Sequence, residues 1–381
     1  MLIKSRRAFA TTAAALSILL ITPSAAQAGV PNSPDATAQA NNGVYALAQA
    51  GDRIIVGGMF SRFGGRARAS VAAVHKDTGV VDKVFNPGTN GVVRALAVSE
   101  DGSTVFIGGV FSVAGGSPRA NLAAVDAVTG VALPDWQANT AGTTPDVNSL
   151  AVKGNRLYVA GRFTGIDGTT RKRLVALDVA TGNLVTSFNP APNGNVREVV
   201  VSPDGTKVYG GGAFSKIGRA DRPAGVGEVL ASNGDATTFN PPIAAGGSGN
   251  VVTIALTPDG SRLFWSTESN LVLAGDPAAG NGIVWTRKFA GNTQGMLASA
   301  SGELYLGGHF SQDQTTGQKR PSYASVYFAD GTLTPWNPKA SGGKLGGWAF
   351  LIEGNHLHVG GFTRYWDGVL QRGYARFTGT P

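Results

Sequence analysis

The stretch "IVGGMFSRFGGRARASVAAV" (55–74) returns 51 residues later as "FIGGVFSVAGGSPRANLAAV" (106–125). In both, an apolar run ends in Gly-Gly-x-Phe, a loop carrying arginine follows, and a second apolar run begins. The same aromatic recurs at nearly constant spacing, at Phe60, Phe111, Phe163, Phe214, Phe310 and Phe362. One degenerate copy fits between Phe214 and Phe310, so the sequence contains seven copies of about fifty residues.

Each copy has four apolar runs separated by turn residues. The first run follows the pattern Val-x-small-Leu-small, as in "VYALA" (44–48), "VRALA" (93–97) and "VNSLA" (147–151). Turns such as "SEDGS", "SPDGT" and "DTG" separate the runs, and the fourth run closes on Phe-Asn-Pro or Trp-Asn-Pro. Short alternating runs bounded by Asx-Gly turns indicate β-hairpins. Each copy is therefore predicted to be a four-stranded antiparallel meander.

Seven such meanders predict an all-β fold, a seven-bladed β-propeller in which each blade packs on its neighbours. The small residues of the first run predict that this strand lines the axis. The last copy stops after its third run, at "YARFTGTP" (374–381), while residues 29–43 precede the first copy unpaired. We therefore expect the N-terminal strand to close the last blade and cover its exposed edge. The copies are expected at about residues 44–92, 93–146, 147–195, 196–250, 251–292, 293–346 and 347–381.

The first 28 residues are typical of an export signal. A basic head with Lys4, Arg6 and Arg7 precedes an apolar run and the cleavage-like sequence Ala26-Gln27-Ala28. Ser5-Arg6-Arg7-x-Phe9 resembles a twin-arginine signal, and an ordinary secretory signal is the alternative. Either one predicts a protein that is secreted, extracellular or held at the cell envelope, with a single domain over 29–381.

Composition narrows the chemistry of this expected domain. The sequence has no cysteine, which excludes disulfides and thiolate metal sites. The formal net charge is +8, and this moderate basic balance does not by itself select nucleic acid. Beyond the signal there is no apolar run long enough for a transmembrane helix, so no membrane span is expected after cleavage.

The repeated pattern Gly-Gly-x-Phe, Gly-x-x-Arg, Leu-Ala-x-x-Asp, Thr/Asp-Gly and Phe-Asn-Pro covers residues 44–377. In this pattern the chain resembles secreted bacterial β-propellers built of the delta-sixty repeat. The resemblance implies the fold and the secreted location, and it implies little about activity. A looser likeness to quinoprotein propellers lies in "AAVDAVTGVALPDW" (123–136).

The arginine of the loop stands in one register in six copies, three residues before the third run. These residues are Arg68, Arg119, Arg171, Arg222, Arg320 and Arg372. The predicted topology places them around one rim, with Arg94 and Arg197, which begin inner strands, near the same mouth. The other face is expected to carry the acidic turns, with Asp77, Asp101, Asp126, Asp178, Asp204, Asp235, Asp259 and Asp330.

Two interpretations of the repeated arginine stay open. Each guanidinium can brace its blade by donating to backbone carbonyls of the inter-blade segments, such as those at Asn-Pro. Alternatively, the arginines form a cationic crown for an anionic partner. Bracing uses only part of the five N–H donors, so the two roles are compatible.

Two copies depart from the repeat and are further candidates for a site. Copy five, "RLFWSTESNLVLAGD" (262–276), lacks the loop and the arginine, which predicts a notch lined by Trp265 and Glu268 or simply a decayed blade. Copy seven carries Tyr365, Trp366 and Asp367, a set suited to stacking on sugar rings. A buried inter-blade aromatic is the alternative there.

Catalytic motifs are sparse. No nucleophile elbow, phosphate loop, EF-hand loop or His-Glu-x-x-His motif occurs. His309, His356 and His358 lack a carboxylate at ligand spacing, so no metal site and no cofactor is expected.

The predicted function is therefore that of a non-catalytic extracellular binding or scaffold propeller, a monomer. Its arginine-rich face would meet an anionic cell-envelope polymer, a carbohydrate or an acidic protein surface, and no specific nucleic acid. The alternative is an enzyme with its site at the central mouth, either a quinoprotein-like oxidoreductase or a polysaccharide lyase or hydrolase.

Overall fold

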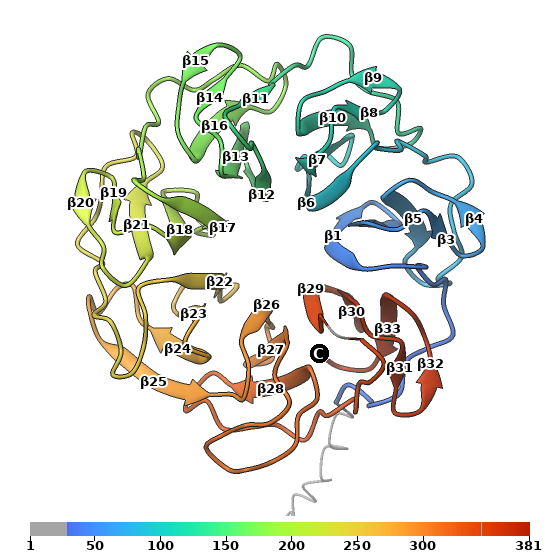
Figure 1. Cartoon of the computed structure of the whole chain (residues 1–381), viewed down its shortest axis with the longest axis vertical. Helices are drawn as coiled ribbons and strands as arrows, with labels where there is room; N and C mark the ends of the chain where they lie inside the picture. The colour runs from blue at the N-terminus through green and yellow to red at the C-terminus, as the bar shows by residue number, and fades with distance from the viewer. Residues whose placement is uncertain (1–28, 344) are drawn as a thin grey trace, which may run out of the picture.

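The computed structural model describes residues 29–343 and 345–381, and the predicted signal peptide lies outside them. Within these ranges the regular structure consists of β-strands, with no helix, so the all-β prediction is confirmed. The larger sheets are arranged radially around a common centre (Figure 1). In the described part of the chain, seven of the sheets with three or more strands have a strand facing this centre, and all seven are antiparallel.

Each of these sheets begins with a strand at the centre of the ring. The inner strands are β1 (Val44–Ala50), β6 (Val92–Val98), β12 (Val147–Lys153), β17 (Asn195–Val201), β22 (Val251–Leu256), β26 (Thr293–Ala298) and β29 (Gly347–Glu353). The second strands are β2 (Arg53–Gly58), β7 (Thr104–Val110), β13 (Arg156–Gly161), β18 (Lys207–Ala213), β23 (Leu263–Thr267), β27 (Glu303–Gly308) and β30 (His356–Gly361). The third are β5 (Val71–His75), β10 (Leu122–Asp126), β16 (Leu174–Asp178), β21 (Val226–Leu230), β24 (Leu271–Gly275), β28 (Tyr323–Tyr327) and β33 (Tyr374–Thr378).

A fourth strand forms in only one of these sheets, as β25 (Ile283–Lys288) beside β24. In five others the expected strand is reduced to a single bridge, such as Val74 to Val81. In the first copy, Asp82 Oδ1 accepts the backbone N–H of Val84 and of Phe85. Because these donors are used locally, they cannot extend the ladder.

In five of the seven sheets the loop between the second and third strands folds into a small hairpin at the outer edge of the ring (Figure 1), while in the sixth sheet this loop forms a single bridge, from Gln312 to Lys319. The hairpins are β3 (Arg62–Phe63) with β4 (Arg66–Ala67), β8 (Val113–Ala114) with β9 (Ser117–Pro118), β14 (Gly165–Ile166) with β15 (Thr169–Thr170), β19 (Lys216–Ile217) with β20 (Ala220–Asp221), and β31 (Tyr365–Trp366) with β32 (Val369–Leu370). β14 also pairs with β11 (Thr140–Ala141), in the segment that joins two sheets.

The Gly-Gly pair ends the second strand where two sheets meet. A Cβ on Gly57 would lie 2.7 Å from Val93 Cγ1, on the next inner strand, and one on Gly108 would lie 2.5 Å from Val147 Cγ1. The last sheet repeats this contact with the first, because a Cβ on Gly360 would lie 2.6 Å from Val44 Cγ1. The same close approach therefore joins successive sheets and closes the ring, and β29 contacts β1.

Every inner strand carries a β-bulge opposite the end of the second strand, where five sheets have the Gly-Gly pair, the third has Ala160-Gly161 and the fifth has Ser266-Thr267. In the first sheet Val44 pairs with Gly58 and Ala46 pairs with Gly57, which leaves Tyr45 as the extra residue. The corresponding register shift occurs in each of the other inner strands. A bulge changes the direction in which the side chain of its extra residue points. Here the bulge lies at the same end of each inner strand.

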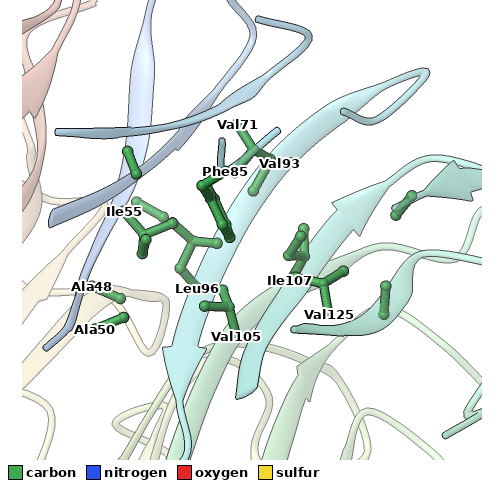
Figure 2. Packing of buried hydrophobic residues seen from close by; sticks show 14 of the residues in the cluster. Ala48, Ala50, Ile55, Val71, Phe85, Val93, Leu96, Val105, Ile107 and Val125 are labelled. Atoms are coloured by element: carbon green, nitrogen blue, oxygen red, sulfur yellow. The ribbon is translucent and has the colours of Figure 1, made fainter. Parts of the chain in front are cut away.

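Apolar cores lie between neighbouring sheets. Figure 2 shows the first of them, where Ile55 and Val71 of one sheet meet Val93, Leu96 and Phe85. Similar clusters of buried residues lie at the other interfaces, and Tyr374 of the last sheet packs with Val44 and Phe63 of the first. Stability therefore comes from interfaces between neighbours, as in other radial repeat folds.

Residues 29–40 run along the outer edge of the last sheet (Figure 1). The Asp35 N–H donates to the Arg376 carbonyl at 2.7 Å, the Asp35 carboxylate pairs with Arg376 Nε at 2.7 Å, and Gly29 forms a parallel bridge with Thr380. These contacts hold the N-terminal segment beside the last sheet. The segment makes these contacts one by one and forms no continuous strand in the described residues.

The sequence alignment of the last copy needs a one-residue correction. Gly308 pairs with Thr293 and Gly361 pairs with Gly347, so Thr363, and not Phe362, corresponds to Phe310. Thr363 is buried, and its hydroxyl donates to Tyr323 Oη at 3.1 Å. Phe362 takes the variable position before it and contacts Tyr45 at 5.5 Å between ring centroids.

Substituting one glycine of a Gly-Gly pair tests this packing. In Gly109→Ala the new Cβ would lie 2.1 Å from the Val92 carbonyl oxygen, so the backbone must shift. We expect a loss of at least about 1–3 kcal/mol in the free energy of unfolding, measured by urea denaturation. The control is Gly282→Ala, which has no heavy atom within 4 Å and should change stability by less than about 0.5 kcal/mol. Equal effects of the two variants would contradict the argument.

Candidate functional site at the channel mouth

The seven bulged residues point toward one mouth of the central channel. They are Tyr45, Arg94, Asn148, Arg197, Val252, Gln294 and Trp348, and all seven line one cavity of about 440 Å³, here called the upper cavity. Asp146, Arg162, Asn195, Glu198, Glu268 and Asn292 complete its wall. This volume lies in the range of pockets that hold small ligands.

Two of the three arginines that line the mouth, Arg94 and Arg197, form ion pairs with described residues, whereas Arg162 donates to the Thr144 carbonyl. Arg94 Nε lies 3.0 Å from Asp146 Oδ2, and Arg197 donates to Glu268 Oε1 at 2.5 Å and to the Val251 carbonyl at 3.0 Å. The hydrogen bond from Arg197 lowers the pKa of Glu268. Burial raises the pKa of Asp146 despite the nearby arginines. The mouth is therefore polar, with its positive charges largely compensated.

An aromatic corner occupies the side of the mouth built by the last and first sheets. Tyr45 and Trp348 lie 5.0 Å apart between ring centroids, with an interplanar angle of 88°. The Arg94 guanidinium carbon lies 5.6 Å from the centre of the Tyr45 ring, and Trp348 Nε1 donates to the Leu345 carbonyl at 2.9 Å. Both rings are held in place while remaining partly exposed.

Glu198 stands one position further along β17, where the other inner strands have small residues. Ser149 Oγ donates to its Oε1 at 2.9 Å, and Thr253 Oγ1 lies 3.5 Å from its Oε2. Burial among the inner strands raises the pKa of Glu198 to about 7. The carboxyl group therefore titrates near neutral pH inside the channel.

A second cavity of about 470 Å³, the lower cavity, continues along the inner strands. Glu198, Arg94 and Trp348 line both cavities. The wall of the lower cavity includes four of the small residues predicted for the axis, Ala46, Ala95, Ser149 and Ala151, together with Gly295, Ala349 and larger side chains such as Leu96, Met296 and Phe350. The channel thus leaves open space opposite the Glu198 carboxyl group.

Most of the repeated arginines brace their own sheets. Arg68, Arg119, Arg222 and Arg320 are buried, with 4–8% of their surface exposed. In each, and in the half-buried Arg171, Nη1 donates to the preceding carbonyl and Nη2 to a carbonyl 14 or 15 residues later. These later acceptors lie two or three residues before the closing aromatic residue of each copy, which is Phe85, Trp136, Phe188, Phe239 or Trp336. The five arginines thus donate to backbone carbonyls, as the bracing interpretation expects.

Arg372 does not belong to this series. Tyr374 pairs with Gly360 as Tyr323 pairs with Gly307, so Gln371 stands at the position of Arg320. Gln371 is buried, and its Nε2 donates to Thr37 Oγ1 at 2.8 Å. It therefore binds the N-terminal segment where the arginines bind their own outer segments, while the Arg372 side chain is exposed.

The expected separation of charge between the two faces is incomplete. Arg219, on an outer hairpin, forms an ion pair with Asp235, a member of the acidic set. Asp101, Asp204 and Asp259 accept backbone N–H groups of their own turns. Hydrogen bonds from the hydroxyls of Ser99, Ser202 and Thr257, together with these backbone bonds, lower the pKa of the three carboxyl groups.

The candidates of copies five and seven lie in different surroundings. Glu268 lines the upper cavity, whereas Trp265 is buried in the core between two sheets. Trp366 is also fully buried, and its Nε1 donates to the Gln371 carbonyl. Tyr365 is 40% exposed at the outer edge, and Asp367 pairs there with Lys339 at 3.2 Å. The structure therefore brings Arg94, Arg197 and Glu268 together and leaves the others outside this cavity.

The histidines are dispersed or buried. His358 bonds Tyr374 Oη at 2.8 Å, and burial lowers its pKa to about 3. His356 bonds Thr378 Oγ1, and His309 bonds Asn292 Oδ1 beside the mouth. Among residues 29–343 and 345–381, no cluster of three or more His, Asp or Glu residues is placed to hold a metal ion.

Radial sheets around a central channel define the class of this protein as a β-propeller. The chain is similar to the crystal structure of the WD40 beta propeller domain of Doa1, with a TM-score of 0.59 and 13% sequence identity, over 92% of this chain and 96% of that chain. At this identity the likeness shows the fold alone. No protein-family model matches the chain, and no curated protein matches it in sequence. In the described ranges no helix has the length and apolar character needed to cross a membrane.

Sequence analysis missed five of the seven bulged residues. The signal was present, because they occupy the x of Val-x-small-Leu-small, which reads Tyr, Arg, Asn, Arg and Val in the first five copies. Glycine and valine recur around them because packing requires them. The variable position is the one that packing leaves free.

Removing a bracing arginine should destabilise the fold. Arg222→Ala loses donors 2.5 Å and 2.7 Å from the Thr237 and Asp221 carbonyls and leaves both acceptors unpaired. We expect a loss of about 2–3 kcal/mol in the free energy of unfolding, measured with urea. Arg372→Ala is the exposed control and should change it by less than about 0.5 kcal/mol. A stable Arg222→Ala protein would refute the bracing role.

The raised pKa of Glu198 predicts a pH-dependent stability. The folded state binds the carboxyl proton more tightly than the unfolded state, whose pKa is near 4.5, so this contribution is lost as pH rises from about 4.5 to about 7. Glu198→Gln removes the titration. The variant should gain about 1–3 kcal/mol relative to the native protein between pH 4 and pH 8, as measured by urea unfolding. A stability difference independent of pH would contradict the prediction.

Proposed function

We propose that this protein is a secreted, non-catalytic binding propeller of the delta-sixty repeat type, with seven blades and a last blade completed by the N-terminal segment. The β-propeller fold and its likeness to a WD40 propeller support a binding or scaffold role, since propellers commonly present loops to partners. The export-like first 28 residues support the extracellular location.

We assign the partner as an anionic polymer or an acidic protein surface. The observation that carries this assignment is a set of exposed cations in or next to the outer hairpins, none of which forms an ion pair with a described residue. They are Arg62, Arg66, Lys172, Lys319, Arg364 and Arg372. Because the repeat places these hairpins in equivalent positions, their charges can act together on an extended anion.

The cationic surface proposed here lies further from the axis than the crown of arginines predicted from the sequence. The buried arginines donate to carbonyls and expose little surface, and Arg94 and Arg197 are paired at the mouth. The exposed hairpin cations are neither buried nor paired with a described carboxylate. A polymer lying along the edge of the ring would meet several of them at once.

Binding to an anionic polymer should depend on salt and on these cations. We expect the secreted form to bind polygalacturonate or teichoic acid at low salt, this binding to weaken steeply as salt rises, and no binding to the uncharged, sugar-free polymer polyethylene glycol. The double variants Arg62→Ala/Arg66→Ala and Arg364→Ala/Arg372→Ala should each weaken binding several-fold, as measured by interferometry.

Lys153→Ala is the control, since Lys153 ends β12 at the other end of the channel. Its loss should leave polymer binding unchanged. The assignment fails when the folded double variants bind as tightly as the native chain, or when the lysine control weakens binding as much as they do.

One observation favours an enzyme as the second candidate. Glu198 and Asp146 line the same cavity, and burial raises the pKa of both. Two carboxyl groups in different environments can share acid and base roles in polysaccharide hydrolysis. Release of reducing ends or unsaturated products from a polysaccharide, abolished by Glu198→Gln, would support this candidate against the binding function.

A further inference from the structure

The upper cavity has features that the exposed hairpin cations do not share. It lies at the centre of the ring, it is lined by one bulged residue from each sheet, and its two ion pairs largely cancel in charge. Such a site does not select a ligand by net charge. Its selectivity must come from hydrogen bonds and from the aromatic corner.

The wall of this cavity contains acceptors that lack donors. Asp146 Oδ1 and Gln294 Oε1 are buried and accept no hydrogen bond in the described structure. The Glu198 carboxyl group receives only the hydroxyls of Ser149 and Thr253, the second at 3.5 Å. Buried acceptors without donors are unfavourable, so a ligand that supplies several O–H groups would relieve that cost.

The aromatic corner supplies the other half of the recognition. Tyr45 and Trp348 meet at 88° and line the cavity together with Gln294 and Glu198. Aromatic rings bind apolar faces, while amides and carboxylates fix orientation. A pyranose ring combines an apolar C–H face with a rim of hydroxyl donors, and it matches both halves.

We propose that the upper cavity binds one uncharged pyranose residue of a glycan, with its C–H face against Trp348 and Tyr45 and its hydroxyls donating to Glu198, Asp146 and Gln294. The inference rests on the proposed binding function and adds the sugar class to it. It places the sugar at the channel mouth, apart from Tyr365 and Trp366 on the outer edge.

Binding of neutral sugars tests this assignment. The probes are methyl α-glucoside, methyl β-galactoside, methyl α-mannoside and N-acetylglucosamine, followed by calorimetry and by saturation-transfer NMR on the folded domain. At least one should bind with an affinity that changes little with salt. Trp348→Ala should weaken it about tenfold, and Glu198→Gln should do so by a similar factor.

Two further variants distinguish loss of sugar contacts from loss of folding and from the loss of any exposed aromatic ring. Trp348→Phe keeps an aromatic ring and should retain most of the affinity, which separates lost stacking from lost folding. Tyr365→Ala is the matched control, because this exposed ring lies outside the cavity. It should bind sugar like the native chain.

The outcomes separate this inference from the proposed polymer binding. Trp348→Ala should leave salt-sensitive polymer binding intact, and the hairpin double variants should leave sugar binding intact. The inference is overturned if all four neutral sugars fail to bind, if only charged sugars bind, or if Tyr365→Ala abolishes binding while Trp348→Ala does not. Loss of polymer binding alone would refute only the hairpin assignment.

Discussion

The structure depends on one steric constraint, the small size of the residues where the second strand passes the bulge of the inner strand. Five of the second strands have a Gly-Gly pair at this point, β13 has Ala160-Gly161 and β23 has Ser266-Thr267. Where two sheets meet, the first residue of the Gly-Gly pair faces the inner strand of the next sheet so closely that a Cβ on Gly57, Gly108 or Gly360 would clash with a valine there. The second glycine lies against the backbone at the start of its own inner strand, where a Cβ on Gly58 would lie 2.2 Å from the Gly43 carbonyl oxygen. The same pair therefore sets the distance between sheets and admits the bulge.

At the bulge, the residues that pack between sheets and the residue that faces the channel occupy different positions. The residues on either side of it, such as Val44 and Ala46, pair with the second strand and are buried. The extra residue has no ladder partner and faces the channel. Substitutions at this position change the mouth while leaving the valine and glycine contacts between sheets in place, although Asn148 and Arg197 also donate to carbonyls of the next sheet. This explains how seven equivalent positions can hold Tyr, Arg, Asn, Arg, Val, Gln and Trp in one chain.

The repeat made the architecture predictable and the site only partly so. Spacing of the Gly-Gly-x-Phe motif placed the inner, second and third strands, because hairpins depend on local turn chemistry and strict alternation. The spacing of the motif did not predict that the fourth strand would end early at Asp82. That ending depends on the Asp82 side chain, which accepts hydrogen bonds from nearby backbone N–H groups. Counting spacing also shifted the last copy by one residue. The error placed Arg372 where Gln371 makes the equivalent bond to the N-terminal segment.

The position of Glu198 shows where the constraint is relaxed. Its equivalents Ala46, Ala95, Gly295 and Ala349 leave space in the channel, and a carboxyl group placed among them loses solvation. Two hydroxyls from the adjacent sheets, those of Ser149 and Thr253, compensate for only part of that loss. The other inner strands have small residues at this position, and replacing one of them by a carboxyl group does not stabilise the fold. A ligand that binds the Glu198 carboxyl group would offset this loss of solvation. The open side of the channel is where such a ligand would reach the carboxyl group.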